Sequence, residues 1–192
     1  MKNILIINGH PDKQSLCNEL AIQYKEGAKS ANAQVELMNL YELDFSINLS
    51  HGYRKRTELE PDLIIAQERI EQAEHLVFVY PTWWGAPPAL LKGFIDRVFL
   101  PGFAFQPHEN SPLWEKLLKG KSARLLVTMD TPGWYNALVY QSAGTKVMKK
   151  NTLEFCGVKP VKTSNFRPVK HSSEQTRAKW IKKAFQLGQS LN

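Results

Sequence analysis

Three segments of the chain combine residue types from which a binding site can be built. The first, GHPDKQSLCN at residues 9–18, joins an apolar run to an amphipathic helix for which Ser15 is the expected N-cap. Free backbone N–H groups and the helix dipole favour an anion at such a junction, and His10 and Ser15 can add side-chain hydrogen bonds. This segment therefore favours phosphate recognition, with a plain capped turn as the alternative.

The second segment, PTWWGAPP at residues 81–88, places two adjacent tryptophans directly after an apolar run. Tryptophan faces and edges suit contact with a planar heteroaromatic ring, which makes Trp83 and Trp84 candidates for that contact. The prolines fix the shape of the segment and leave the backbone amides of residues 82–85 to bind polar ring atoms. A hydrophobic corner or a dimer contact would use the same residues.

The third segment, DTPGWY at residues 130–135, again places turn formers and aromatic residues after an apolar run. Thr131 and Gly133 offer backbone amides, and Trp134 and Tyr135 offer ring faces. Asp130 could act as a general base, but a turn residue that caps nearby N–H groups is the more frequent role.

Several catalytic motifs are absent from the sequence. It contains no GxGxxG or GxxxxGK[ST] phosphate loop, no GxSxG nucleophile elbow, no HExxH and no paired CxxC. Cys17 is expected to be a small buried helix residue, and no metal site is predicted. Aromatic rings and backbone donors with few ionisable groups indicate that a bound cofactor supplies the reactivity.

The elements that must position these segments alternate between strand and helix five times. Apolar runs without sustained alternation predict strands at residues 3–8, 34–40, 75–80, 123–129 and 158–166. We therefore predict a single α/β domain over residues 1–192. Its fold would be a flavodoxin-like, doubly wound, five-stranded parallel sheet in the order 2-1-3-4-5, with helices on both faces. That order brings the three segments together at the carboxyl edge of the sheet.

The connections between these strands carry helix signals. Pro61 fits the first turn of one helix, residues 142–155 form another, and Ser172 with Gln175 makes a capping box for a last one. Residues 44–60 are polar and irregular, which predicts a loop.

The composition is that of an ordinary globular chain, with 43% hydrophobic and 22% charged residues and a formal net charge of +7. No apolar run is long enough for a membrane span, and Cys17 and Cys156 fit no disulfide or metal pattern, so we expect a reducing, cytoplasmic setting. The scattered lysines are interpreted as solvated helix faces. Attraction of polyphosphate ligands stays open, whereas nucleic-acid binding has only the net charge in its favour.

The stretch PTWWGAPPALLKGFIDRVFLPGFAF at residues 81–105 resembles the signature of the flavodoxin-like NAD(P)H:quinone oxidoreductases. This family also includes bacterial general stress proteins and ancillary subunits of potassium efflux systems. The resemblance extends to HPDKQS, DTPGWY and LEFCGVKPV, which are weak individually, whereas PALLKGFIDRVF is specific.

The resemblance implies a bound flavin, FMN or FAD, with NAD(P)H as electron donor and a quinone or related acceptor reduced by two electrons in a ping-pong hydride transfer. By position, the residues that would hold the flavin are His10, Ser15, Leu16 and Cys17 at the phosphate, Pro81, Thr82, Trp83, Trp84 and Gly85 at the ring, and Thr131, Pro132, Gly133 and Tyr135 at its other edge. Trp84 and Tyr135 are the residues assigned to catalysis.

The resemblance also implies a homodimer with residues 99–105 near the subunit boundary. Better-studied members keep a tyrosine and a histidine beyond the third segment. Here Tyr135 and Tyr140 are present, but His108 is the one histidine between residue 105 and the fifth predicted strand, so we assign no proton relay. The alternative function is a flavin-binding ancillary subunit of a potassium efflux system, with a membrane transporter as partner. A flavodoxin-type electron carrier ranks last, because such carriers are usually acidic.

Overall fold

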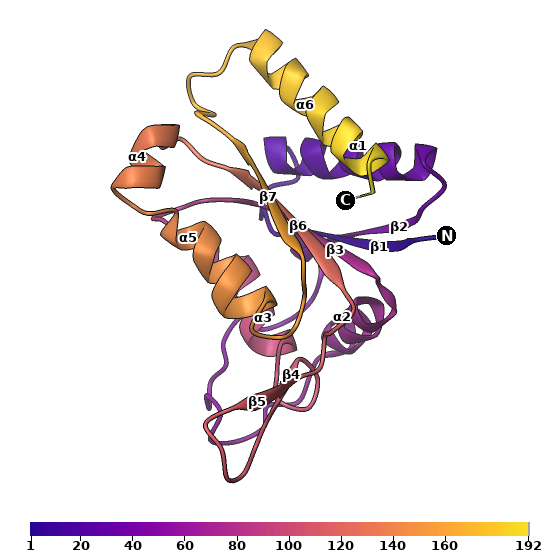
Figure 1. Ribbon diagram of the computed structural model, residues 1–192, viewed down its shortest axis with the longest axis vertical. Coiled ribbons are helices and arrows are strands. Elements are labelled where there is room, and N and C mark those ends of the chain that lie inside the picture. The colour runs from indigo at the N-terminus through magenta and orange to yellow at the C-terminus, as the bar shows by residue number, and fades with distance from the viewer. Residues whose placement is uncertain (192) are drawn as a thin grey trace.

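A five-stranded parallel sheet forms the centre of the molecule in the computed structural model, which describes residues 1–191 (Figure 1). Its strand order is β2-β1-β3-β6-β7, which confirms the predicted 2-1-3-4-5 order for the five strands of this sheet. The strands are β1 (Asn3–Asn8), β2 (Gln34–Asn39), β3 (His75–Pro81), β6 (Ser122–Thr128) and β7 (Val161–Phe166).

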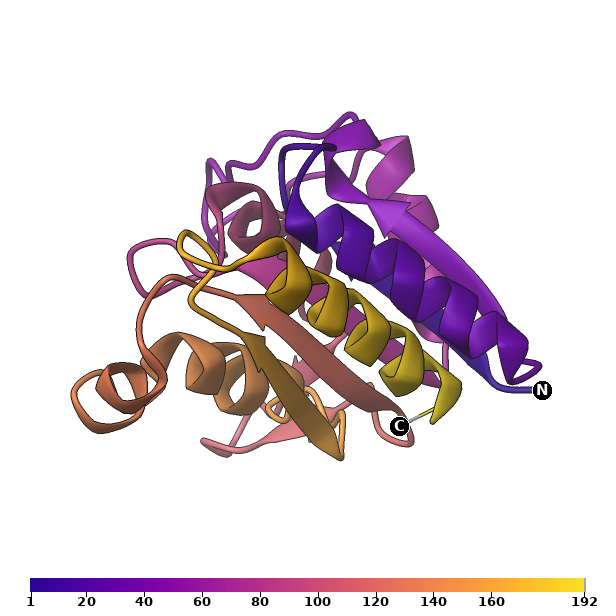
Figure 2. The same cartoon turned by 90° about the horizontal axis from the view of Figure 1, so that it is seen from above.

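Helices cover both faces of the sheet, as predicted, with α1 and α6 side by side on one face and the other helices opposite (Figures 1 and 2). The helical segments are α1 (Leu16–Ser30), η1 (Leu40–Glu42), α2 (Pro61–Gln72), α3 (Ala89–Val98), α4 (Gly133–Leu138), α5 (Ala143–Lys146), η2 (Val147–Leu153) and α6 (Glu174–Gln189). None of the helices within residues 1–191 has the length and apolar character needed to cross a bilayer.

The central strand β3 explains why the strand sequences show no polar alternation. All seven of its residues are buried, and it pairs with β1 on one side and β6 on the other. One core forms where α2, α3 and η2 pack on the sheet, and a second core forms under α1 and α6. Because both faces are covered, side chains pointing either way must be apolar.

Several boundaries differ from the prediction. The last helix is capped by Ser173, whose Oγ accepts the N–H of Thr176, because the Oγ of Ser172 donates to the carbonyl of Val169. The helix predicted over residues 142–155 is divided into α5 and the π-helix η2. A hairpin, β4 (Phe105–Pro107) with β5 (Trp114–Lys116), was not predicted, since strands of three residues have too short a pattern.

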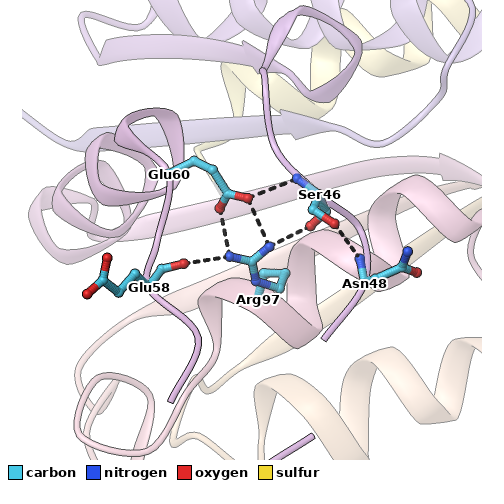
Figure 3. Close-up of polar contacts among 5 residues, drawn as sticks. All are labelled: Ser46, Asn48, Glu58, Glu60 and Arg97. Carbon is cyan, nitrogen blue, oxygen red and sulfur yellow. Dashed lines mark hydrogen bonds and ion pairs between the residues drawn. The ribbon is translucent and has the colours of Figure 1, made fainter. Parts of the chain in front are cut away.

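The segment at residues 44–60 has no helix or strand, as predicted, but it is firmly anchored (Figure 3). The Arg97 side chain of α3 is almost fully buried, and its guanidinium donates to the carbonyls of Ser46 and Glu58 at 2.7 and 2.8 Å. It also makes a paired contact with the Glu60 carboxylate at 2.7 and 3.1 Å. Desolvation raises the pKa of Glu60, but hydrogen bonds from Arg97 and the Ser46 N–H outweigh it, so the net pKa is lowered.

A buried polar group lies at the opposite, amino edge of the sheet. His75 is buried between the hydroxyl of Tyr24, 3.3 Å from Nε2, and the hydroxyl of Ser122, 2.7 Å from Nδ1. Desolvation, together with the positive charges of Lys2, Arg124 and Lys162, lowers the pKa of His75 from 6.5 to about 3. The folded protein therefore keeps this imidazole neutral.

This burial predicts a pH dependence of stability. Between about pH 6.5 and 3 the unfolded chain takes up a proton at His75 that the folded chain does not, so the free energy of unfolding should fall as the pH is lowered. The slope from this one group is about 1.4 kcal/mol per pH unit. In His75→Gln the slope of the free energy of unfolding against pH, measured by urea unfolding between pH 6.5 and 4, should be smaller by about that amount. The exposed His108→Gln should keep the wild-type slope, and equal slopes in all three proteins would contradict the assignment.

Candidate functional site

Two adjoining cavities lie at the carboxyl edge of the sheet, where the three segments singled out in the sequence meet. Thr82 and Met129 line both of them. The first cavity, of about 240 Å³, is lined by His10, Asp12, Ser15, Leu16, Cys17, Pro81, Thr82, Trp83, Thr128, Met129, Asp130 and Val169. The second, of about 470 Å³, is lined by Thr82, Trp84, Gly85, Met129, Thr131, Asn136, Tyr140, Ala143, Gly144 and Thr145.

The loop after β1 is shaped by a chain of hydrogen bonds that starts at Asn8. This buried side chain donates to the side-chain oxygens of Asn18 and Asn39, each at 3.2 Å, and accepts the N–H of His10. The Nδ1 of His10 accepts the N–H of Asp12 at 2.9 Å. Because Nδ1 is the acceptor, the neutral ring carries its proton on Nε2, which can donate to a ligand.

His10 is half-buried beside the first tryptophan. Its ring meets Trp83 edge to face, with centroids 5.4 Å apart. Desolvation lowers the pKa of His10, while the negative charge of Asp12 opposes the shift. The neutral, Nε2-protonated ring is therefore favoured at neutral pH.

The amino end of α1 closes the first cavity. Ser15 is the N-cap, as predicted, and its Oγ accepts the N–H of Asn18 at 3.2 Å. Helix geometry leaves the N–H groups of Leu16 and Cys17 without an intrahelical acceptor, so they are available to an anion. The Cys17 thiol lies 3.2 Å from the hydroxyl of Thr128, and desolvation raises its pKa to about 12, which makes it a buried structural thiol.

The segment after β3 forms a tight turn in which Trp83 and Ala86 exchange backbone hydrogen bonds of 2.9 and 3.0 Å. Trp84 and Gly85 at its tip have φ values of +51° and +75°. Left-handed backbone is costly for a tryptophan, and such strain is concentrated at functional sites. The Trp84 side chain is fully exposed at the mouth of the second cavity.

The segment after β6 leads into α4, which forms the far side of the second cavity. The carboxylate of Asp130 accepts the N–H of Lys170 at 2.6 Å, so it bonds to the loop that follows β7 and not, as predicted, to nearby N–H groups. Tyr135 does not line either cavity but contacts the ring of Tyr140, with centroids 5.0 Å apart. Tyr140 and the buried Asn136 are the polar side chains of α4 and its following loop that line the second cavity.

A close backbone contact connects the two sides of the second cavity. A Cβ built on Gly144 would lie 2.0 Å from the carbonyl oxygen of Gly85, so only a glycine fits at the start of α5. The loop before it also has left-handed residues, Gln141 and Ser142, with φ values of +49° and +54°. The contact fixes the distance between the tryptophan turn and α5, and with it the width of the cavity.

Most of the residues predicted for the site come together here. The lining of the first cavity includes His10, Ser15, Leu16, Cys17, Pro81, Thr82 and Trp83, and that of the second includes Thr82, Trp84, Gly85 and Thr131. The predicted residues Pro132, Gly133 and Tyr135 line neither cavity. Sequence reasoning missed Thr128, Met129 and Val169 in the first cavity and Asn136, Ala143, Gly144 and Thr145 in the second. Met129 could have been found as the residue that ends the fourth predicted strand, but the residues after α4 follow no recognisable pattern.

Several known proteins are similar to this chain over almost its whole length. A family model described as a flavodoxin-like fold matches residues 2–187. An uncharacterized NAD(P)H oxidoreductase from Haemophilus influenzae is 27% identical over 98% of this chain and 95% of its own length. The ribosyldihydronicotinamide dehydrogenase (quinone) of Rattus norvegicus is 25% identical over 95% of this chain and 90% of its own. The solved NAD(P)H:quinone oxidoreductase of Methanothermobacter marburgensis superposes with a TM-score of 0.84 at 25% identity, covering 100% of this chain and 99% of that one.

The Gly85–Gly144 contact predicts the effect of adding one methyl group. Gly144→Ala forces either the tryptophan turn or α5 to move, and overpacking of this kind costs about 1–3 kcal/mol of stability. Urea unfolding should show that loss, and tryptophan fluorescence should report a changed environment for residues 83 and 84. The neighbouring Thr145→Ala adds no atom and serves as the control. If Gly144→Ala were as stable as the wild type, the two loops would be free to separate.

Proposed function

The chain belongs to the flavodoxin-like NAD(P)H:quinone oxidoreductase family, and we propose that its two adjoining cavities bind a flavin through which NAD(P)H reduces quinones or related acceptors. The observation that best supports this is the joining of an anion-binding cavity to an aromatic-lined one at Thr82 and Met129. A phosphorylated ring compound needs both environments in this arrangement. We further propose a two-electron, ping-pong cycle in which the donor and the acceptor bind in turn over the face of the ring held in the second cavity.

The first cavity suits the phosphate of either FMN or FAD. The N–H groups of Leu16 and Cys17, the hydroxyl of Ser15 and the Nε2–H of His10 can all donate to phosphate oxygens. The neighbouring carboxylate of Asp12 forms a hydrogen bond within its own loop, because its Oδ1 accepts the N–H of Gln14 at 2.8 Å. The donors present therefore fit an anionic group.

The second cavity suits the ring. Pro81 and Thr82 lead into the tryptophan turn on one side, and Thr131 lies on the other. Backbone N–H groups in these turns can hold polar ring atoms, and they can stabilise negative charge on a reduced ring because they are fixed in advance. When bound, a flavin would accept a hydride from NAD(P)H and deliver two electrons to the acceptor.

The residues assigned to catalysis have different roles in this proposal. Trp84 contacts the ligands directly as an aromatic surface at the mouth of the cavity, and orientation there matters because hydride transfer requires reacting atoms about 3–3.5 Å apart. Tyr135 acts as a positioning residue, because its ring supports Tyr140, whose side chain lines the cavity. We assign no proton relay to either tyrosine.

We also propose that the protein is a cytoplasmic homodimer. Large apolar side chains are exposed around the second cavity, at Trp84, Trp134, Leu138, Val139 and Tyr140. Exposed apolar surfaces of this kind mark contact sites, and a second subunit would cover them. The two free, buried cysteines are consistent with a reducing compartment.

The proposed function predicts a coloured protein. Purified protein mixed with FMN or FAD should retain flavin absorption after gel filtration. Without an acceptor it should oxidise about one equivalent of NADH or NADPH per flavin, and added quinone should allow continued turnover. Initial rates at varied donor and acceptor concentrations should give the parallel double-reciprocal lines of a ping-pong cycle. A protein that stays colourless with both flavins and oxidises neither nicotinamide would refute the proposal.

His10 provides a test of the phosphate position. His10→Ala should weaken FMN binding about tenfold, because one hydrogen bond to a charged group is lost. Binding of riboflavin, which has no phosphate, should be unchanged. His108→Ala, in the exposed loop of the hairpin, should leave both affinities as in the wild type. Equal weakening of FMN and riboflavin would place His10 at the ring and not at the phosphate.

A further inference from the structure

A positive charge lies directly behind the residue that joins the two cavities at the carboxyl edge. Met129 lines both cavities, and the Nη1 of Arg167 lies 3.8 Å from the Met129 sulfur. Arg167 itself lines neither cavity, and its side chain is partly buried in the segment that follows β7. It was not among the residues predicted for the site, because no motif surrounds it in the sequence.

The backbone around Met129 holds Arg167 in this place. The N–H of Met129 donates to the carbonyl of Phe166 at 3.1 Å, and the carbonyl of Met129 accepts the N–H of Val169 at 3.2 Å. These two hydrogen bonds lie on either side of Arg167 in the sequence, so the segment 166–169 is fixed against the residue that follows β6. The guanidinium is therefore placed by the same edge of the sheet that carries the cavities.

A glycine allows the guanidinium to approach the third segment of the site. A Cβ built on Gly133 would lie 3.0 Å from the Nη2 and 3.1 Å from the Nε of Arg167, so a side chain at this position would crowd the guanidinium. Gly133 belongs to the turn that the resemblance assigns to one edge of the flavin ring. Arg167 thus contacts both the residue shared by the cavities and this turn.

Most of the hydrogen-bonding capacity of Arg167 is unused within residues 1–191. A guanidinium offers several N–H donors, and the one hydrogen bond that Arg167 makes in this part of the chain is to the Met129 thioether, a weak acceptor. No carboxylate among these residues lies within ion-pair distance of it. A partly buried charge that is not neutralised by a neighbour keeps its electrostatic effect on its surroundings.

The lining of the two cavities contains no permanent positive charge of its own. Over residues 1–191 neither a lysine nor an arginine lines them, whereas Asp12 and Asp130 line the first. Arg177 lies near the first cavity, but its guanidinium already donates to the Ser172 hydroxyl at 2.9 Å and to the Val169 carbonyl at 3.3 Å. Arg167 is therefore the cation that can act where the two cavities join.

Reduction changes the charge that this site must accommodate. A hydride consists of two electrons and one proton, so its transfer from NAD(P)H leaves one negative charge on the accepting ring and converts the donor to NAD(P)⁺. The oxidised ring is neutral. A fixed cation nearby consequently stabilises the reduced ring and has little effect on the oxidised one.

We propose that Arg167 raises the reduction potential of the bound flavin, because its positive charge acts from behind Met129 and Gly133 to stabilise the anionic reduced ring. An arginine suits this role because its charge does not depend on pH in the physiological range. The inference rests on the proposed function, since it requires a flavin ring in the second cavity. It adds a residue of this chain that favours hydride uptake without touching the donor or the acceptor.

The reduction potential of bound FMN measures this effect without turnover. It is obtained anaerobically near neutral pH by equilibrating the FMN-loaded protein with a redox dye and following flavin absorption. Arg167→Gln should lower the potential by about 30 mV, which corresponds to a tenfold loss of preference for the reduced form in a two-electron couple. Arg167→Lys keeps the charge, and its potential should lie closer to that of the wild type than to that of Arg167→Gln.

A matched variant controls for net charge. Lys162→Gln removes one positive charge from an exposed position on the same strand, β7, and should keep the wild-type potential. An equal decrease in Lys162→Gln and Arg167→Gln would show a general charge effect and would overturn the inference.

Affinities for oxidised FMN and for riboflavin separate the other roles that Arg167 could have. An unchanged potential in Arg167→Gln would overturn the inference. Weaker binding of FMN alone would then assign Arg167 to the phosphate, and equal weakening of FMN and riboflavin would assign it a merely structural role. A wild-type protein that retained no flavin would instead refute the proposed function, and this inference with it.

Discussion

The burial of the sheet on both faces is the constraint on which the rest of the structure depends. Every residue of β3 is buried, and its backbone groups are satisfied by β1 and β6. A polar side chain within such strands would lose its hydration without compensation, so the polar side chains that could bind a ligand lie at the ends of the strands. The candidate site is consequently built from loops, while the sheet supplies the fixed frame that brings those loops together.

At the carboxyl edge this frame is extended by hydrogen bonds from β1 into the first loop. Asn8, the last residue of β1, bonds to the side chains of Asn18 and Asn39 and to the backbone of His10. One buried amide thereby connects α1, β2 and the loop that lines the first cavity. Because Asn8 itself is fully buried, removing one of its partners would leave its amide with an unsatisfied group, which favours a single loop conformation.

The sequence allowed the parallel sheet and much of the site to be predicted because both depend on local signals. Apolar runs located the five strands, Ser15 located the cap of α1, and the aromatic turns located the edge at which the two cavities lie. The hairpin of β4 and β5 and the π-helical form of η2 could not be predicted, because tertiary packing determines them. Trp114, for example, stacks on Phe155 at a centroid distance of 4.1 Å and donates its indole N–H to the carbonyl there, which holds β5 in place. The roles of Arg97 and Glu60 were hidden for the same reason, since 37 residues separate the partners.

The contact between Gly85 and Gly144 has a consequence for how such chains can diverge. The carbonyl of one residue occupies the space that a side chain at the other would need, although the two positions are far apart in sequence. A homologue with a side chain at position 144 would need a different conformation of the tryptophan turn, so the two loops must change together in evolution. The lining of the second cavity can therefore change by single substitutions at positions such as Thr145, but remodelling across the two glycines demands coordinated changes.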